Sequence, residues 1–219
     1  MTSDNLTAYN ISTVDLDGDI VKNIYDWKKN GTSIALFNMP FDGGDSNDTH
    51  VRDYSNHGNN GTGVGDGYRN ITGGYDGHDS YHFDAVDDYI DVSIPLSNNF
   101  TIAMWIYPTN PDAYGSLAAE DSTVGLFLKS NNFLTYYFSS TDHNADTALT
   151  TSTWQHIAIV NNASNLTFYL NGLPDGTYAS APSMTVEYIG TDNLNEAFGG
   201  FLDDYLIFNL SLTPDQIYI

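Results

Sequence analysis

Two strands that follow each other within residues 81–108 constrain the fold more than any other stretch of the chain. In residues 89–94 apolar side chains alternate with polar ones, so that Ile90, Val92 and Ile94 share a face, which is the periodicity of a half-buried strand. Residues 100–107 carry little that is polar on either face, so we expect this strand to be covered on both sides. A strand of this kind lies in the middle of a sheet that packs on another layer, and it predicts the centre of a β-sandwich.

The chain of 219 residues is strongly acidic, with 28 Asp and Glu residues against 6 Lys and Arg residues and a net charge of -22. Such a surface repels nucleic acid and anionic membranes, so we expect neither as a partner. Nearly all of the acid is aspartate, which favours turns and calcium loops, whereas glutamate favours helices. The lack of cysteine excludes disulfides, thiolate zinc sites and cysteine nucleophiles.

No stretch of the sequence predicts a membrane span or a signal peptide. No window approaches the roughly 20 apolar residues of a span, and residues 1–9 are polar. We therefore expect no direct membrane insertion. A short polar start on a chain that otherwise resembles an exported one suggests a processed protein or a piece of a larger protein.

Strand and turn signals continue along the rest of the chain. The expected elements are an apolar strand at 33–42, short edge strands within the polar stretch 45–79, hairpins within 124–139 and 153–170, and a last strand at 201–209. Asn171 and Gly172 form the strongest turn signal, and Thr213 followed by Pro214 indicates the start of a short helix. Without any long helical period, this spacing predicts an all-β sandwich.

Residues 1–33 differ from the rest of the chain and hold most of the lysines. Their pattern of Asp15, Asp17 and Asp19 followed by Tyr25 and Trp27 resembles part of an Ig-like or PKD-like surface module, so we treat 1–33 as a partial module or linker. Alternating carboxylates can chelate a cation, as in calcium loops, although a solvated turn between two strands is the simpler interpretation.

Four groups of motifs in the remaining chain occur in a characteristic order. They are residues 53–61 (DYSNHGNNG), 81–90 (YHFDAVDDYI) with 100–106 (FTIAMWI), 154–158 (WQHIA) with 168–172 (FYLNG), and 200–209 (GFLDDYLIFN) with 212–217 (LTPDQI). In this order they resemble the laminin G-like, concanavalin A-like jelly-roll domain over residues 34–219. The resemblance implies two curved antiparallel sheets of about six or seven strands each.

The same resemblance implies a calcium ion. Strict alternation in residues 201–208 puts Asp203 and Asp204 on opposite faces, so one acid must lie on an apolar face and needs hydrogen bonds or a cation. Related domains often hold a structural calcium near the junction of the first and last strands. This makes Asp42 and Asp203 candidate ligands, with Asp53, Asn60 and Asp84 as helpers. A purely hydrogen-bonded role for Asp203 is the alternative. Leu206 stands where many relatives carry arginine, which removes an ion pair there.

Catalysis is not expected. Retaining glycosidases of related fold need paired carboxylates, and their Glu-x-Asp-x-x-Glu pattern cannot form from the three isolated residues Glu120, Glu187 and Glu196. Asp87 and Asp88 begin a strand at a turn, where turn and metal-loop chemistry is the better interpretation. The histidines show no zinc spacing, and no Gly-x-Ser-x-Gly turn is present.

Binding is the better class of function. The candidate ligand-binding aromatics are Tyr114, Tyr136, Tyr137 and Tyr178, whereas Trp105 and Trp154 are interpreted as core. We expect a module that recognises a carbohydrate or a surface glycoprotein at the cell surface or outside the cell of a bacterium or archaeon, beside neighbouring domains of a larger protein. The alternative is a structural or assembly unit that self-associates and has no small ligand. The sequons include Asn60, Asn70, Asn99, Asn165 and Asn209, each either a glycosylation site or turn chemistry.

Overall fold

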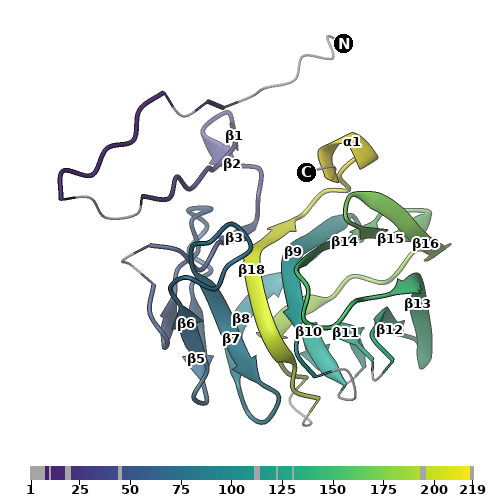
Figure 1. Ribbon diagram of the computed structural model, residues 1–219. Helices are drawn as coiled ribbons and strands as arrows, with labels where there is room; N and C mark the ends of the chain where they lie inside the picture. The colour runs from purple at the N-terminus through teal and green to yellow at the C-terminus, as the bar shows by residue number, and fades with distance from the viewer. Residues whose placement is uncertain are drawn as a thin grey trace.

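The chain forms two stacked antiparallel sheets, with one short helix near its C-terminal end (Figure 1). The computed structural model describes residues 8–9, 11–17, 21–43, 46–110, 114–121, 123–129, 131–192 and 196–217. Within these residues each sheet has eight strands, slightly more than expected. The prediction of an all-β sandwich of antiparallel sheets is confirmed.

The first sheet has the order β13 (Thr141–Ala148), β12 (Phe133–Phe138), β11 (Val124–Leu128), β10 (Gly115–Asp121), β17 (Thr185–Ile189), β8 (Tyr89–Pro95), β5 (Gly61–Val64) and β4 (His50–Val51). The second sheet has the order β16 (Leu173–Ala179), β15 (Asn165–Leu170), β14 (Gln155–Asn161), β9 (Phe100–Pro108), β18 (Gly199–Phe208), β7 (Ser80–Asp84) and β6 (Tyr68–Asn70), and β3 (Phe37–Met39) also pairs with β18. A separate ribbon pairs β1 (Lys28–Lys29) with β2 (Thr32–Ser33), and the helix is α1 (Pro214–Ile217).

The strand predicted to be central, β9, lies between β14 and β18 in the second sheet. Strand β9 does not form a hairpin with β8, the strand before it in the sequence. Strand β7 belongs to the second sheet, β8 to the first and β9 to the second again. This switching between layers is how a jelly roll encloses one core between its two sheets.

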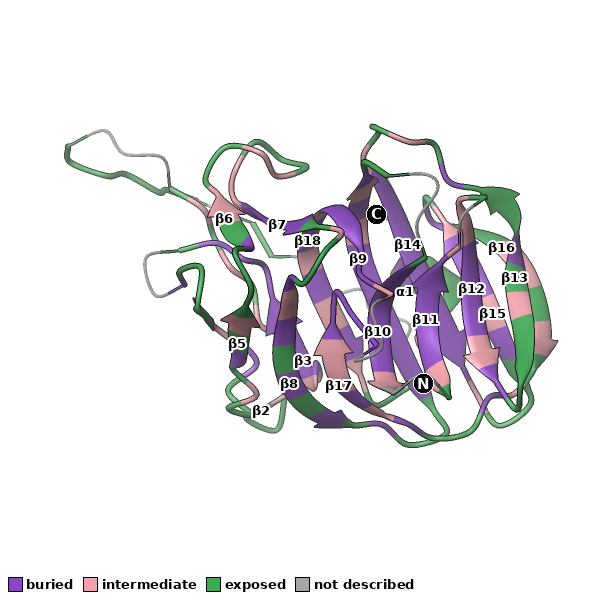
Figure 2. Cartoon of the chain, turned by 90° about the horizontal axis from the view of Figure 1, so that it is seen from below, coloured by how far each residue is buried: buried purple, intermediate pink, exposed green. Residues whose placement is uncertain are grey.

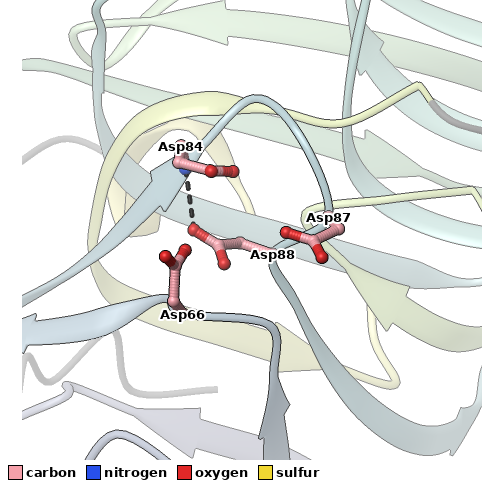
Figure 3. A group of neighbouring side chains, drawn as sticks. All are labelled: Asp66, Asp84, Asp87 and Asp88. Carbon is pink, nitrogen blue, oxygen red and sulfur yellow. Dashed lines mark hydrogen bonds between the residues drawn. The ribbon is translucent and has the colours of Figure 1, made fainter.

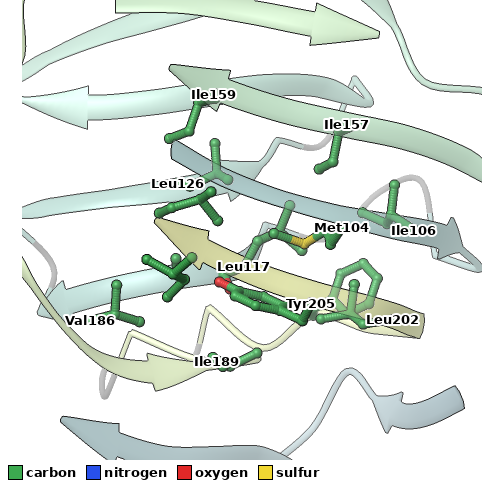
Figure 4. Close-up of a cluster of buried hydrophobic side chains, with 14 of the residues drawn as sticks. Met104, Ile106, Leu117, Leu126, Ile157, Ile159, Val186, Ile189, Leu202 and Tyr205 are labelled. Carbon is green, nitrogen blue, oxygen red and sulfur yellow. The ribbon is translucent and has the colours of Figure 1, made fainter. Parts of the chain in front are cut away.

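The core lies between the sheets and is built from the inward face of each strand (Figures 2 and 4). From β9 it receives Met104 and Ile106, from β14 Ile157 and Ile159, and from β18 Tyr205. The Tyr205 ring is fully buried, and its hydroxyl donates a hydrogen bond to the Leu117 carbonyl at 3.0 Å. The one polar atom of this ring is therefore satisfied inside an apolar layer.

Local signals in the sequence correspond to the expected turns. Asn171 and Gly172 connect β15 to β16 with φ values of 49° and 77°, as a turn of type I′ requires. Gln216 closes the start of α1 by accepting hydrogen bonds from the Thr213 backbone N–H at 2.9 Å and from its hydroxyl at 3.2 Å. The polar stretch 45–79 holds the short strands β4, β5 and β6, and β4 and β6 lie at the edges of their sheets, as expected, whereas β5 lies between β8 and β4.

A β-bulge in β18 overturns the alternation predicted for residues 201–208. The register with β9 shifts between Asp203 and Leu206, and Asp204 has a φ of 45°. Because the bulge inserts one residue, Leu202 and Tyr205 both face the core, whereas Asp203 and Asp204 both lie on the outer side of the second sheet. The prediction that the two acids face opposite ways is wrong, since strict alternation holds only for a regular strand.

The N-terminal segment packs against the sandwich at several points. The Asn38 side chain donates to the Tyr25 carbonyl at 3.1 Å, and the Lys22 Nζ lies 2.7 Å from Asp42 Oδ2. Asp19 lies outside the described residues, so the Ig-like or PKD-like pattern stays a prediction. Among the residues that the structure describes, no helix has the length and apolar character needed to cross a membrane.

Candidate functional site

The bulge in β18 brings two acids next to Asp42, which follows β3. One carboxylate oxygen each from Asp42, Asp203 and Asp204 lies within 4.8 Å of the others. The structure therefore brings together Asp42 and Asp203, the two main candidate calcium ligands. It adds Asp204, which strict alternation would place on the opposite face of the strand from Asp203.

Lys22 neutralises this acidic group. Its Nζ lies 2.7 Å from Asp42 Oδ2, 2.8 Å from Asp76 Oδ2 and 3.6 Å from Asp204 Oδ1. Burial disfavours the charged ammonium, but the charge of Asp204 and the hydrogen bonds to Asp42 and Asp76 outweigh it, so the pKa of Lys22 is raised. The ammonium stands where a calcium ion would have to bind. These acids therefore do not fit a calcium site while Lys22 is in place.

Asp203 is the most perturbed acid of the group. It is fully buried, and its Oδ2 accepts a hydrogen bond from the Tyr75 N–H at 2.9 Å. Burial, followed by the charge of Asp204, raises the pKa of Asp203 to about 8. Such a value often marks a catalytic acid, but this carboxyl is shielded from solvent and cannot reach a substrate. Its role is structural.

Asp53 and Asn60 serve a different purpose from that expected of helper ligands. Asp53 Oδ1 accepts the N–H groups of Asn38 at 3.0 Å and Ser55 at 2.9 Å, and its Oδ2 accepts the Ser55 hydroxyl at 2.7 Å and the Asn59 N–H at 3.0 Å. Asn60 Oδ1 accepts the Asp53 N–H at 2.9 Å. Both carboxylate oxygens are thus engaged, and hydrogen bonds order this part of the long polar stretch.

The remaining metal candidate, Asp84, belongs to a second acidic group. It lies with Asp66, Asp87 and Asp88, and one carboxylate oxygen of each lies within 4.8 Å of the others (Figure 3). The sequence singles out Asp84, Asp87 and Asp88 as turn and metal-loop residues, but Asp66 comes from a different turn and carries no comparable signal.

Two of the four candidate tyrosines meet around Lys129 on the first sheet. Tyr114 precedes β10, Tyr137 lies on β12 and Lys129 follows β11. The Lys129 Nζ lies 4.7 Å from the centre of the Tyr114 ring and 5.9 Å from that of Tyr137. These are cation–π distances. Because the neighbouring Tyr136 faces the core, Tyr137 points to the outer side of the sheet.

Further polar groups complete this site, which we call the tyrosine pocket. It is a hollow of about 330 Å³ lined by Tyr114, Phe127, Lys129, Tyr137 and Glu196. Lys129 Nζ also donates to both carboxylate oxygens of Asp142, at 2.8 and 2.9 Å. Burial and then the charge of Asp192 raise the pKa of the Glu196 carboxyl, against the opposing charge of Lys129.

The other two tyrosines are structural. Tyr136 is fully buried and its hydroxyl contacts Met184 Sδ, so its prediction as an exposed ligand-binding residue is wrong: it falls on the inward face of β12. Tyr178 donates to the Asn144 carbonyl at 2.6 Å and packs edge-on against His143 and Phe168, which links β16 to β13.

A larger cleft of about 600 Å³ lies between residues 21–27 and the outer side of the second sheet. Trp105 lines it, stacked on Tyr75 with ring centres 3.3 Å apart and meeting His156 edge-on. The sequence pattern predicts Trp105 as a core residue, and this prediction is wrong. It is only half-buried, because even positions of β9 face the core and odd positions face outward. His156 is buried, and burial lowers its pKa to about 4.

The five candidate glycosylation sites lie at or near the surface. Asn60, Asn99, Asn165 and Asn209 are exposed, and Asn70 is half-buried. Asn209 also accepts hydrogen bonds from the N–H and the hydroxyl of Ser97, at 2.9 and 2.6 Å. Asn209 therefore accepts hydrogen bonds between distant segments, and both turn chemistry and modification stay predictions for the sequons.

Lys22, Lys129 and Glu196 were missed by sequence reasoning. A usable signal existed for the lysines, since they are two of only 6 basic residues in a chain of net charge -22. A basic residue that is scarce and surrounded by acid is expected to be ion-paired. Which acids it contacts depends on strands that are far apart in the sequence.

Comparison with known proteins assigns the family. The sequence matches the model of the concanavalin A-like lectin/glucanases superfamily over residues 76–218, well over half of its length. The chain belongs to this superfamily. A comparison with curated proteins gives no match.

Solved structures similar to this chain include several binding domains. Domain 4 of AbnA, an extracellular GH43 arabinanase from Geobacillus stearothermophilus solved with arabinotriose, is 18% identical, with a TM-score of 0.68 over 84% of this chain and 96% of that domain. The binding domain of Paraclostridial Mosquitocidal Protein 1 is 18% identical, with a TM-score of 0.62 over 84% of this chain and 50% of that structure.

A third similar structure comes from botulinum neurotoxin type C, whose cell entry is described as dependent on two ganglioside molecules. It is 14% identical, with a TM-score of 0.61 over 84% of this chain and 49% of that structure. The chain therefore spans about half of these toxin structures and nearly all of the arabinanase domain. At such identities the likeness concerns the fold.

Proposed function

We propose that this chain is a non-catalytic carbohydrate-binding module and that the tyrosine pocket is its glycan site. The observation that carries the proposal is the convergence of Tyr114 and Tyr137 on Lys129 at the outer side of the first sheet. Tyr114 is 42% exposed, so a ligand can reach ring surface and charged groups in one place.

The chemistry of the tyrosine pocket suits a sugar. A sugar ring has an apolar face of C–H groups and a rim of hydroxyls. The tyrosine rings offer apolar surface for the face, while Lys129, Asp142 and Glu196 donate to and accept from the rim. Hydrogen bonds to charged groups are stronger than neutral ones, and they fix the orientation of a bound ring. A volume of about 330 Å³ accommodates a short saccharide and lies at the lower end of small-molecule sites.

The similar structures support this class of ligand without deciding it. One was solved with arabinotriose, and another is described with gangliosides. Their identities of 18% and 14% are too low to transfer a site residue by residue. The choice of pocket therefore rests on the residues of this chain.

The contacts that the carboxylates make within the chain favour binding without hydrolysis. Retaining glycosidases place two carboxyl groups about 5–5.5 Å apart across the scissile bond. In the tyrosine pocket Asp142 holds Lys129 through both of its oxygens, which leaves it poorly suited to act as a nucleophile. The other acidic groups are occupied by Lys22 or belong to turns at the edge of the sandwich.

The larger cleft near Trp105 is the less suitable glycan site. One face of the Trp105 ring is covered by Tyr75, and much of the polar rim of the cleft is already ion-paired through Lys22. Its lining is mainly apolar, and part of it is the chain's own residues 21–27. Hydroxyl groups of a sugar would find few unengaged partners there.

An extracellular or cell-surface location goes with this proposal. The arabinanase that contains the similar domain 4 is extracellular. The partners we infer are a glycan or surface glycoprotein and the neighbouring domains of a larger surface protein. The exposed sequons and the net charge of -22 are consistent with this setting.

A glycan array followed by calorimetry tests the proposal. The purified chain is applied to the array, and the best glycan, with arabinotriose as a starting probe, is then titrated into wild type, Tyr114→Ala and Tyr137→Ala. Loss of one stacking ring is expected to weaken binding about 10-fold, or roughly 1.4 kcal/mol. Tyr9→Ala is the matched control, since Tyr9 is 81% exposed and far from the pocket in sequence; it is expected to bind as wild type does.

Two results would overturn the proposal. If Trp105→Ala weakens binding while both pocket variants bind normally, the glycan site is the larger cleft. If no glycan binds and light scattering shows self-association, the chain is a structural or assembly unit.

A further inference from the structure

Five aromatic side chains form a row across the outer side of the second sheet. The strands β6, β7, β18, β9 and β14 are consecutive neighbours in that sheet (Figure 1), and they carry, in this order, Tyr68, His82, Phe201, Tyr107 and, directly before β14, Trp154. None of these residues lines the tyrosine pocket or the larger cleft near Trp105. We call this set the aromatic row.

Strand register places the side chains of the aromatic row opposite one another. His82 pairs with Tyr68 on one side and with Phe201 on the other. Phe201 in turn pairs with Tyr107. Ile106, the residue before Tyr107, faces the core. Because residues directly opposite each other in a sheet share a face, these four side chains all point away from the core.

The rings contact one another along the whole row. The ring centres of Tyr68 and His82 lie 4.6 Å apart, and those of His82 and Phe201 lie 4.8 Å apart. The centres of Phe201 and Tyr107 are 5.9 Å apart, and those of Tyr107 and Trp154 are 5.6 Å apart. Four strand spacings of about 4.8 Å give the row a length of roughly 19 Å. The outcome is a narrow, continuous strip of aromatic surface.

This strip is open to solvent. Tyr68 is 43% exposed, and the other four side chains are half-buried. Trp154, which the sequence pattern predicts as a core residue, lies outside the core, so that prediction is wrong. The face of an antiparallel sheet that meets water usually carries polar side chains. Contiguous apolar surface in such a place marks an interaction site.

The size of the aromatic row favours a narrow ligand over a protein partner. An aromatic side chain buries about 150–250 Å² when enclosed, so five rings that are open over about a third of their surface expose roughly 300 Å². A stable protein interface buries about 800 Å² on each partner. A linear polymer that lies along the row needs only this strip.

Ring chemistry and charge define the class of ligand. The apolar ring surface suits the C–H face of a sugar, while the hydroxyls of Tyr68 and Tyr107 and the indole N–H of Trp154 suit its hydroxyl groups. The net charge of -22 repels anionic polymers and also a second copy of the chain. An uncharged polysaccharide meets neither obstacle.

We propose that the aromatic row binds one strand of an uncharged, linear polysaccharide that lies across the second sheet. The tyrosine pocket belongs to the outer side of the first sheet, so the two sites face opposite ways. Together they make the module bivalent, and this part of the proposal rests on the proposed function of the pocket. Two sites on one domain hold two glycan chains of the same surface, which raises avidity.

Affinity electrophoresis in native gels tests the aromatic row. The gels contain linear arabinan, mixed-linkage β-glucan or β-mannan, which are uncharged, or polygalacturonate as the anionic comparison. The starting protein is the variant Tyr114→Ala, Tyr137→Ala, so that retardation reports sites outside the tyrosine pocket. It is expected to be retarded by at least one uncharged polymer and not by polygalacturonate.

The two ends of the row are then removed from this starting protein. Adding Tyr68→Ala and Trp154→Ala is expected to weaken binding about 10-fold, since each ring contributes contact surface. Circular dichroism checks the fold. Tyr68→Ala alone, on the edge strand β6, is expected to weaken binding about 3-fold and keeps the test decisive if the pair destabilises the protein. Tyr25→Ala is the matched control, because Tyr25 is 49% exposed and lies outside the row, and it should leave retardation unchanged.

Four results would overturn the proposal. The starting protein is retarded by none of the three uncharged polymers, which leaves the tyrosine pocket untouched if wild type still binds a short saccharide in calorimetry. The row variants are retarded as strongly as the starting protein, or Tyr25→Ala weakens binding as much as they do. Polygalacturonate retards the starting protein as strongly as the uncharged polymers. Light scattering shows self-association that Trp154→Ala abolishes, which would make the row a protein interface.

Discussion

Replacing Lys22 by methionine removes the only cation that contacts the acids at the junction of β3 and β18 in the described part of the chain. Its partner Asp42 has a side-chain exposure of 2%, and Lys22 itself 16%, so the bond between them is a buried ion pair. The methionine keeps most of the volume of the lysine stem. The variant therefore tests the charge and not the packing.

The expected loss follows from burial. Removing one partner of a buried ion pair costs about 3–5 kcal/mol, because the other charge stays buried without compensation. Asp76 and Asp204 have side-chain exposures of 34% and 40%, so solvent screens their pairs with Lys22 and each adds at most about 1 kcal/mol. We expect Lys22→Met to lower the free energy of unfolding by about 4 kcal/mol, a large share of the roughly 5–15 kcal/mol that native proteins have.

Urea denaturation at pH 7, followed by tryptophan fluorescence, measures this loss. Lys28→Met is the control, since Lys28 is 45% exposed and lies 3.5 Å from Asp26, and it should cost less than about 1 kcal/mol. Added calcium should restore part of the stability of Lys22→Met, because the acids are then free for a metal ion. A loss for Lys22→Met no greater than that for Lys28→Met would refute the reasoning.

Two further predictions concern the same part of the molecule. The pKa of about 8 for Asp203 lies above its unfolded value, so its protonated form is favoured by folding and stability should fall as pH rises toward 8. Between pH 6 and 8 wild type should lose about 2 kcal/mol more than Asp203→Asn, and equal slopes of unfolding free energy against pH would contradict this. Asp53→Ala leaves four donors without their acceptor, so it should cost about 3 kcal/mol or more in urea denaturation. Asp175→Ala, whose carboxylate accepts exposed hydrogen bonds from Thr147, is the comparison and should cost under about 1 kcal/mol, and a similar loss in both would argue against the Asp53 network.

Sequence reasoning succeeded where the information is local. The period of two in β8 follows from the printed sequence, as does the turn at Asn171 and the cap at Thr213. Each depends on residues a few positions apart. Tyr136 and Tyr137 show the limit of this information, because alternation separates their faces without saying which face lies inward.

The candidate sites depend on contacts between distant segments. The tyrosine pocket joins Tyr114, Lys129 and Glu196 from three separate segments, and no local pattern marks that meeting. The bulge at Asp204 could not be foreseen either, since it is stabilised by partners such as Lys22, which lies far away in the sequence. Trp105 was misplaced because an apolar strand looks the same whether its outer side is covered by protein or lines a cleft.

By itself, the sequence determined the all-β class, the layered position of β9 and the motif order that indicates a concanavalin A-like domain. These follow from hydrophobic period and turn chemistry, which act over a few residues. Only the tertiary structure decided that Lys22 stands among the acids near β18, that Asp66 joins Asp84, Asp87 and Asp88, and that two tyrosines share a lysine. The reason is that charge compensation depends on distances in space, and strand pairing sets those distances across the whole chain.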